Sequence, residues 1–207
     1  MLPLSQIAAL RTTVDDEWRS PVADAVGRPW DIPPGGLRYW RSSAAHVFVI
    51  PPGGDARGVL YARFAPARSL AGARLQRGAQ LHGRLSDAGA PVANLVRSRA
   101  GRSMELIQTP LGDMAACVVR RLDGEELDVD ELDADSAAAW GTALAEFHRT
   151  AGEVVPASAP PPRNPFAGLA RHRTDPGLAA AAQEFAMHWG PESGPLVVAT
   201  GTLNWTT

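Results

Sequence analysis

Cysteine is almost absent from this sequence, which holds a single one, Cys117, among its 207 residues. One cysteine excludes an internal disulfide framework and fits a reducing compartment. It lies in the apolar run from Ala115 to Val119. We therefore interpret Cys117 as a small core residue and not as a nucleophile.

Long apolar runs and a strong excess of one charge are also missing. No stretch approaches the roughly 20 apolar residues that a membrane span needs, and the N-terminus lacks the basic and then apolar pattern of a signal peptide. The formal net charge is -2, with a pI near 6.2, so no positive field attracts nucleic acid or an anionic membrane. We expect a soluble cytoplasmic protein that has neither as a partner.

Metal-ligand spacing is absent among the histidines. His46, His82, His172 and His188 lie far apart in the sequence, and none belongs to a ligand cluster of the usual spacing. We expect them to be solvated or packed, and we predict no metal site made by this chain alone.

The composition is that of an ordinary globular protein, with 45% hydrophobic and 20% charged residues. That is enough for one medium domain or two small lobes. We predict an N-terminal extension over residues 1–29, with a short helix over Leu4–Leu10, then a sheet unit over 30–124. A hinge and a partly helical region follow over 125–207.

The sheet unit is predicted from runs of β-branched and aromatic residues between turn signals. A stretch with helical spacing, Arg68–Asp87, interrupts these runs, although its three glycines each cost about 1 kcal/mol relative to alanine. Short connections favour an antiparallel sheet with one helix across it, an α+β fold. The predicted strands are Leu37–Arg41, His46–Ile50, Val59–Phe64, Val92–Val96, Ser103–Gln108 and Ala115–Arg120, with a hairpin turn at Thr109–Asp113.

Beyond an acidic segment, Glu125–Asp135, an apolar stripe at helical spacing indicates the clearest helix of the chain. Asp133 or Asp135 can cap its start, and Gly152 fits its end. A proline-rich connection, a helix over 176–188 and a short strand, Leu196–Val198, are predicted to follow. The stripe consists of Ala137, Trp140, Leu144, Phe147 and Ala151.

Five segments follow one another along the chain in an order that carries information. They are Tyr39–Phe48, Gly58–Pro66, Asp87–Ala93, Cys117–Gly124 and Trp140–His148. In this order they resemble the first hairpin, the third strand, the link from the helix to the fourth strand, the fifth strand with the hinge, and the Gly-x-x-Leu-Ala-x-Leu-His helix of the aminoglycoside phosphotransferase family, which has a protein-kinase-like fold. The resemblance implies a five-stranded antiparallel N-lobe with one helix, followed by a helical C-lobe.

The resemblance implies an ATP-dependent kinase of small molecules, with a nucleotide held by the hairpin loop, the third strand and the hinge. The acceptor is a small hydroxylated molecule whose identity stays open. The complete family member also uses Mg²⁺. The residues that correspond to the nucleotide site are Ser42, Ser43, Ala44, Arg63, Arg120, Arg121 and Leu122.

Two departures concern the phosphate-contacting cation. The family has a lysine on the third strand, and this chain has Arg63, which keeps the charge but not the compact shape. The acid expected on the following helix falls near Gly78, where Gln76 and Gln80 are the nearest polar side chains. Arg63 can equally be a surface residue of a strand, and Ser42 and Ser43 can be plain turn residues.

The family's catalytic His-Gly-Asp motif, with its Asn and its metal-binding Asp, is not found anywhere in the chain. We therefore expect that the chain is truncated before the catalytic loop, with no catalytic residue and no metal ligand. Read one base out of frame, codons for residues 198–207 allow Gly-Asp-Trp-Asp-Phe-Glu-Leu-Asp-Asn, close to that loop. We hypothesise a frameshift at this point of the gene, which sequencing of the coding DNA in all three frames would test.

Three functions stay open from the sequence. The first is a phosphotransferase that is inactive as the chain stands. The second is a non-catalytic nucleotide-binding or interaction module of kinase-like fold. The third is a decayed protein that exposes the apolar stripe of its last clear helix, for which poor solubility would be the sign.

Overall fold

The computed structural model describes residues 1–124, 132–155, 177 and 180. Several predictions fall on segments outside these residues. They are the first part of the acidic segment, the proline-rich connection, nearly all of the helix predicted over 176–188, the strand Leu196–Val198 and the segment of the frameshift hypothesis.

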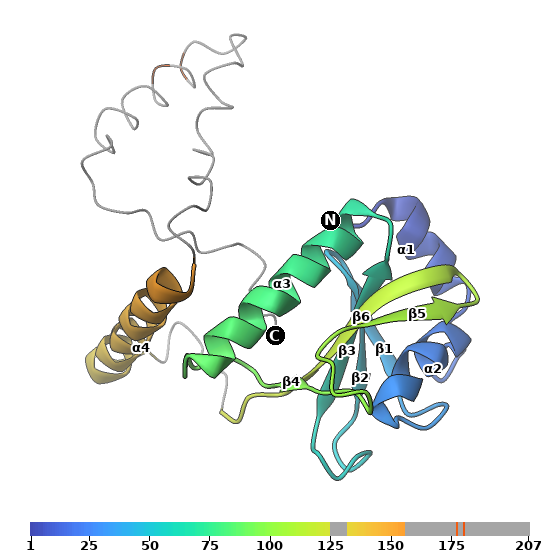
Figure 1. The fold of residues 1–207 in the computed structure, drawn as a ribbon, viewed down its shortest axis with the longest axis horizontal. Coiled ribbons are helices and arrows are strands. Elements are labelled where there is room, and N and C mark those ends of the chain that lie inside the picture. Colours follow the sequence, from blue (N-terminus) through green and yellow to red (C-terminus); the bar gives the residue numbers. More distant parts are fainter. Residues whose placement is uncertain (125–131, 156–176, 178–179, 181–207) are drawn as a thin grey trace.

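An antiparallel sheet and a few helices make up the described part of the chain (Figure 1). Every strand pair in the sheet is antiparallel, as the sequence predicts. The strands are β1 (Arg38–Ser42), β2 (His46–Ile50), β3 (Leu60–Pro66), β4 (Leu95–Val96), β5 (Glu105–Thr109) and β6 (Gly112–Arg120).

The sheet has six strands where the resemblance implies five. Its order is β1-β2-β3-β6-β4, and β5 also pairs with β6. The first half of β6 pairs with β5, and its end pairs with the two residues of β4. Two short strands thus share one edge of β6, so six strands occupy five positions.

Helix α2 (Pro21–Gly27) and the 3-10 helix η1 (Arg28–Trp30) have no counterpart in the sequence prediction. The Ser20 side chain accepts a hydrogen bond from the N–H of Val22, and Pro21 opens the helix, which is a usual helix start. The prediction missed them because one apolar turn is too short to show a period. The predicted N-terminal helix is confirmed as α1 (Leu4–Arg11).

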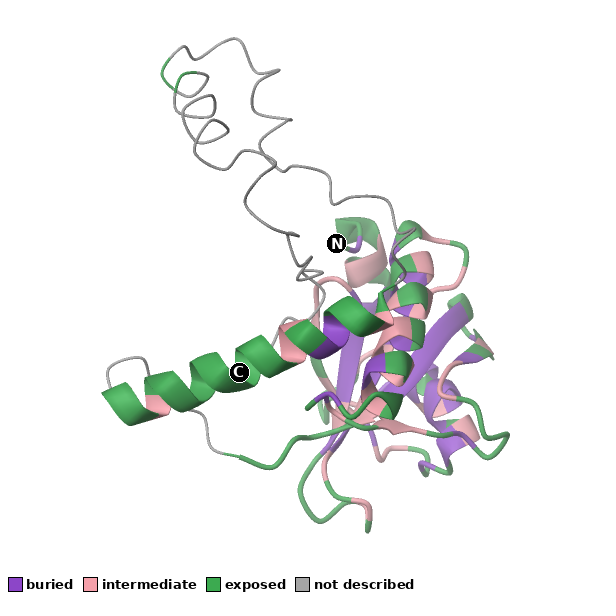
Figure 2. Ribbon diagram, turned by 60° about the vertical axis from the view of Figure 1, so that its left-hand side comes forward, coloured by how far each residue is buried: buried purple, intermediate pink, exposed green. Residues whose placement is uncertain are grey.

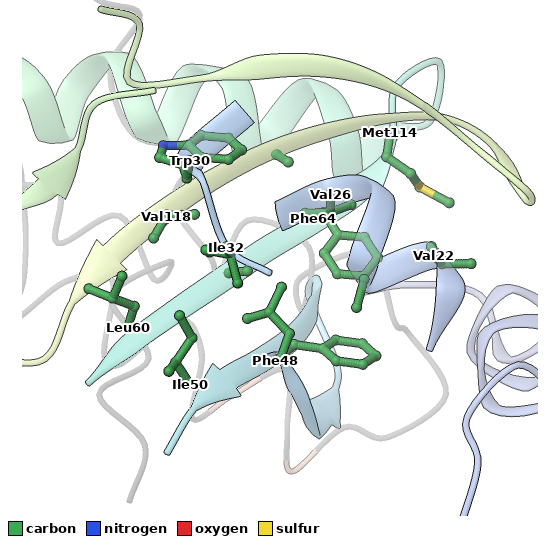
Figure 3. Packing of buried hydrophobic residues seen from close by; sticks show 14 of the residues in the cluster. Val22, Val26, Trp30, Ile32, Phe48, Ile50, Leu60, Phe64, Met114 and Val118 are labelled. Atoms are coloured by element: carbon green, nitrogen blue, oxygen red, sulfur yellow. The ribbon is translucent and has the colours of Figure 1, made fainter. Parts of the chain in front are cut away.

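The main core fills the face of the sheet that α2 and η1 cover (Figure 3). Phe48 and Phe64 stack at 5.6 Å, and Val22, Val26 and Trp30 close over the sheet. The residues assigned from sequence to an N-terminal extension therefore share the core of the sheet.

Helix α3 (Leu70–Asp87) covers the opposite face. Ser69 caps its start, and Ala71, Leu75, Ala79 and Leu85 are buried. Leu70, the first residue of the helix, is exposed.

Helix α4 (Ala134–Val154) begins at Asp133, whose side chain accepts a hydrogen bond from the N–H of Ser136 at 2.7 Å. This decides between the two predicted caps. The helix runs past Gly152 to Val154, so the predicted end at that glycine was wrong. Its last turns pack against the end of α3, while most of the helix stands clear of the sheet (Figure 2).

None of the helices in the described ranges combines the length and the apolarity that crossing a membrane requires.

Candidate functional site

Arg63 lies in the middle of β3, opposite Val47 of β2 and Cys117 of β6. Its neighbours Ala62 and Phe64 belong to the core cluster. Because side chains alternate along a strand, Arg63 lies on the face that α3 covers. In the described part of the chain no carboxylate lies within ion-pair distance of it.

His82 of α3 lies close enough to Arg63 for the two side chains to interact electrostatically. Its Nε2 donates a hydrogen bond to the Ala93 carbonyl. Burial lowers the pKa of His82, the hydrogen bond to Ala93 raises it by less, and the charge of Arg63 lowers it. The helix therefore presents a neutral imidazole near Arg63.

The two glutamines that were the nearest polar candidates from sequence lie toward the edge of the sheet. Gln76 and Gln80 line a hollow of about 430 Å³ against Ser103, Met104 and Leu106 at the β5 edge.

Cys117 is buried beside Arg63, as predicted for a core residue. Burial raises the pKa of the Cys117 thiol to about 11, and the Arg63 charge acts weakly in the other direction. The thiol is therefore protonated at neutral pH and is not a nucleophile.

An aromatic pair lies on the same face as Arg63, and the sequence prediction did not single it out. Trp40 meets Tyr61 edge to face, with ring centroids 6.5 Å apart. Tyr61 lies two residues before Arg63 and pairs with Val119 of β6. The spacing Tyr61-x-Arg63 could have predicted it, because residues two apart on a strand share a face. Trp40 is 50% exposed, so the pair offers an accessible apolar surface.

Three of the predicted residues lie at the turn between β1 and β2, where Ser42 ends β1 and Ser43 and Ala44 belong to the loop. They differ in what they can bind. The Ser42 hydroxyl lies 2.8 Å from His46 Nδ1 and accepts a hydrogen bond from the Tyr39 hydroxyl. His46 packs on Phe64 in the core, so the hydroxyl of Ser42 lies on the face opposite Arg63. The Ser42 hydroxyl is therefore already hydrogen-bonded to His46 in the core.

The other two loop residues differ in their backbone groups. The Ser43 N–H donates to the Ala45 carbonyl. Within the described residues the Ala44 N–H makes no hydrogen bond. Of the three predicted loop residues, Ala44 therefore has the backbone donor that is available to an anion.

The predicted hinge residues lie at the end of β6, where Arg120 is the last residue of the strand and Arg121 and Leu122 follow it. The N–H of Arg120 donates to Asn94 and that of Arg121 donates to Val59. Both backbone donors are occupied, whereas among the described contacts the N–H of Leu122 has no such partner. All three residues are exposed.

The register brings Tyr61 and Arg63 to one face of the sheet, whereas Arg120, opposite Leu60, belongs to the register of the core face. A second hollow, of about 420 Å³, lies on the other side of the β5 edge, against Arg28 and Arg99. Neither hollow includes a predicted nucleotide residue. Across residues 1–124 and 132–155, no group of three or more His, Cys, Asp or Glu could hold a metal ion.

A model of the phosphotransferase enzyme family (APH) matches residues 43–192, from the β1–β2 loop to well beyond α4. That match covers most of the chain. The chain belongs to the phosphotransferase enzyme family. The recognition made from the five sequence segments is thereby confirmed.

A solved structure supports the kinase-like fold of this family member. It is amicoumacin kinase hAmiN in complex with AMP-PNP, Ca²⁺ and Ami, with a TM-score of 0.53 and 17% sequence identity. The likeness covers 69% of this chain and 42% of that kinase, so the chain spans less than half of the kinase's length. No curated protein sequence matches the chain.

Proposed function

We propose that the chain binds ATP on the α3 face of its sheet, as part of an ATP-dependent phosphotransferase for a small hydroxylated molecule. The observation that carries this is Arg63, a half-buried cation in the middle of β3 with no carboxylate partner among the described residues. An unpaired cation in such a position is costly unless an anion completes it. A phosphate group is the anion that the family membership suggests.

The charge of the described lobe supports an anionic ligand. Residues 1–124 hold 16 of the 20 basic side chains but 10 of the 22 acidic ones. The chain has no lysine, so every basic side chain is an arginine. A guanidinium forks to two phosphate oxygens where an ammonium makes a point contact.

The aromatic pair and the hinge supply the other half of a nucleotide site. The Trp40–Tyr61 pair provides a ring surface on which a purine base can stack. The Leu122 N–H is the hinge donor that is not already used. In this arrangement the base lies at the hinge end of β3 and the phosphates lie toward Arg63 and the Ala44 N–H.

The described residues do not fit a Mg²⁺ site, because they hold no cluster of suitable ligands. We therefore assign no step to a metal ion. The residues of the described lobe bind and orient the nucleotide, and they contribute no general acid or base near Arg63 apart from the neutral His82.

The test is calorimetric titration of the full chain with ATP and with AMP-PNP, for Arg63→Ala and for Arg28→Ala. Arg28 is exposed on η1, on the other face of the sheet. A hydrogen bond to a charged group contributes about 1.5–3 kcal/mol, so Arg63→Ala should weaken binding roughly 10- to 100-fold. Arg28→Ala should bind as the unchanged chain does. A folded chain that binds neither nucleotide contradicts the proposal.

A second candidate function is a nucleotide-binding module without catalysis. The specific observation in its favour is the neutral His82 in place of a carboxylate near Arg63, because the cation then lacks the partner that would hold it in one position. Nucleotide binding without phosphate transfer to any of a panel of alcohols, sugars and amino alcohols would favour this candidate. Transfer to one of them would rule it out.

A further inference from the structure

The first residues of the chain hold the tip of the β1–β2 hairpin from the α3 face. The Leu2 N–H donates a hydrogen bond of 2.7 Å to the Ser43 carbonyl. The Leu2 side chain is buried against Ala65 and Ala71, which belong to the end of β3 and the first turn of α3. One residue therefore joins the loop, the strand of Arg63 and the helix across it.

The other end of α1 holds the same hairpin from the core face. The Arg11 guanidinium lies 4.7 Å from the ring centroid of Tyr39, and Trp18 stacks beside that ring at 6.3 Å. The Tyr39 hydroxyl donates to Ser42, whose oxygen also contacts His46. Residues 1–11 thus contact the hairpin on both faces, and we name them the N-terminal clasp.

We propose that the N-terminal clasp sets the affinity for the nucleotide by fixing the position of residues 43–45. This rests on the proposed function. The Ala44 N–H can meet a phosphate only if the loop stays in place, and few backbone hydrogen bonds hold the loop between the paired residues Ser42 and His46. Its described backbone bonds are the one within it, from Ser43 to Ala45, and the one from Leu2. Leu2 is therefore a positioning residue that acts through the loop and does not touch the nucleotide.

The energetic reason is the entropy of ordering. Fixing the backbone of one residue costs about 1–2 kcal/mol, and a loop that is already ordered does not pay this again when the ligand arrives. Releasing two or three residues should weaken nucleotide binding about 10-fold or more. The contact of Leu2 with Ala71 also links the loop to the start of α3.

Position 4 offers a matched control in the same segment. Leu4 is 83% exposed, whereas Leu2 is 4% exposed. The experiment compares Leu2→Asp with Leu4→Asp in the full chain. Amide hydrogen exchange without nucleotide is measured for peptides that cover residues 42–47, and the Kd for AMP-PNP is measured by calorimetry.

We expect Leu2→Asp to speed exchange of the loop amides at least 10-fold and to raise the Kd for AMP-PNP at least 10-fold. Leu4→Asp should change neither the exchange rate nor the Kd, and the conservative variant Leu2→Met should keep both close to those of the unchanged chain. Where Leu2→Asp fails to fold, Leu2→Ala takes its place, with the same direction and a smaller effect.

The proposal is overturned if loop exchange in a folded Leu2 variant equals that of the unchanged chain. It is also overturned if exchange speeds up while the Kd stays the same. If the unchanged chain binds no nucleotide, the proposed function fails, and with it the role of the clasp in affinity. The exchange data then show separately whether the clasp orders the loop.

Discussion

Two glycines of α3 that look alike in the sequence differ in the structure. A Cβ at Gly72 would lie 2.3 Å from the Pro66 carbonyl oxygen and 2.9 Å from that of Ala67. A Cβ at Gly78 would meet nothing within 4 Å. Gly72 is therefore needed for the close approach of α3 to the end of β3, and Gly78 is not.

Alanine at these two positions should have opposite effects on stability. Gly78→Ala removes the entropy cost of a helical glycine and should raise the free energy of unfolding by about 0.5–1 kcal/mol. Gly72→Ala forces strand and helix apart and should lower it by at least about 1 kcal/mol. Urea denaturation of both variants measures this. A stabilising Gly72→Ala would contradict the close packing.

His46 gives the second prediction at the scale of single residues. Burial lowers its pKa from 6.5 to about 4, so the folded chain keeps this imidazole neutral where the unfolded chain takes up a proton. The free energy of unfolding should therefore fall as pH drops from about 6.5 to about 4, by no more than about 3 kcal/mol for this residue.

The measurement is the pH dependence of urea denaturation for the unchanged chain and for His46→Asn. Asn keeps a polar partner for Ser42 but does not titrate. We expect a flatter pH profile for this variant over the same window. Asp55, whose pKa is lowered to about 2 by Arg57, loses its contribution mainly below pH 4 and so leaves the window clear. Parallel profiles would show that His46 does not titrate as described.

The loop between β2 and β3 is held to η1 by one arginine. Arg57 makes a two-point contact with Asp55, at 2.8 and 2.6 Å, and donates to the Trp30 carbonyl at 2.9 Å. Trp30 in turn donates from its indole N–H to the carbonyl of Val96. The loop, η1 and β4 are therefore linked through two side chains.

Removing Arg57 should cost more stability than removing an exposed arginine nearby. Arg57→Ala leaves the carbonyl of the buried Trp30 without this donor and Asp55 without its charged partner, and should lower the free energy of unfolding by about 1–2 kcal/mol. Arg99 pairs with Asp31 where both side chains are exposed, and Arg99→Ala should leave it nearly unchanged. The melting temperatures of the two variants are compared by thermal unfolding. Equal losses of stability would show that Arg57 contributes no more than an exposed arginine.

Most strands could be predicted from sequence because they are bounded by turn residues and rich in β-branched side chains. β2 was predicted residue for residue as His46–Ile50. β4 shrank to Leu95–Val96 because its earlier residues leave the edge of β6. α2 escaped prediction because its apolar residues are nearly all buried within a single short helix, so no polar face marks a period.

The candidate site was partly accessible from sequence. Arg63 and the hinge were identified through the family pattern, and the sheet places Arg63 on the face that α3 covers. The aromatic pair, His82 as the neighbour of Arg63 and the engaged hydroxyl of Ser42 depend on strand register and helix phase. A one-residue error in either moves a side chain to the other face, so these details needed coordinates.

At the scale of the molecule, the attachment of α4 rests on a small contact. Ala151 is buried with Leu85, Ala90 and Val92, while Trp140 near the other end is 66% exposed. The helix is thus fixed at its C-terminal turns and exposed over the rest of the apolar stripe predicted from sequence.

An arginine at this contact should release the helix and leave the sheet intact. Ala151→Arg cannot fit the buried position, so amide exchange over residues 137–154 should speed up at least 10-fold while exchange in β2, β3 and β6 stays the same. Ala139→Arg, on the exposed side of the same helix, is the control. Equal exchange in both variants would show that Ala151 does not hold α4.

The N-terminal clasp and the absence of lysine together have a practical consequence. In a chain produced as residues 1–207, the α-amino group of Met1, a residue that is 86% exposed, is the one primary amine, because no side chain supplies another. An amine-reactive dye would therefore attach at one place, a single residue away from the Leu2 amide that bonds to Ser43. The chain can be labelled beside its candidate phosphate loop without introducing a mutation, and the dye would report the movement of that loop.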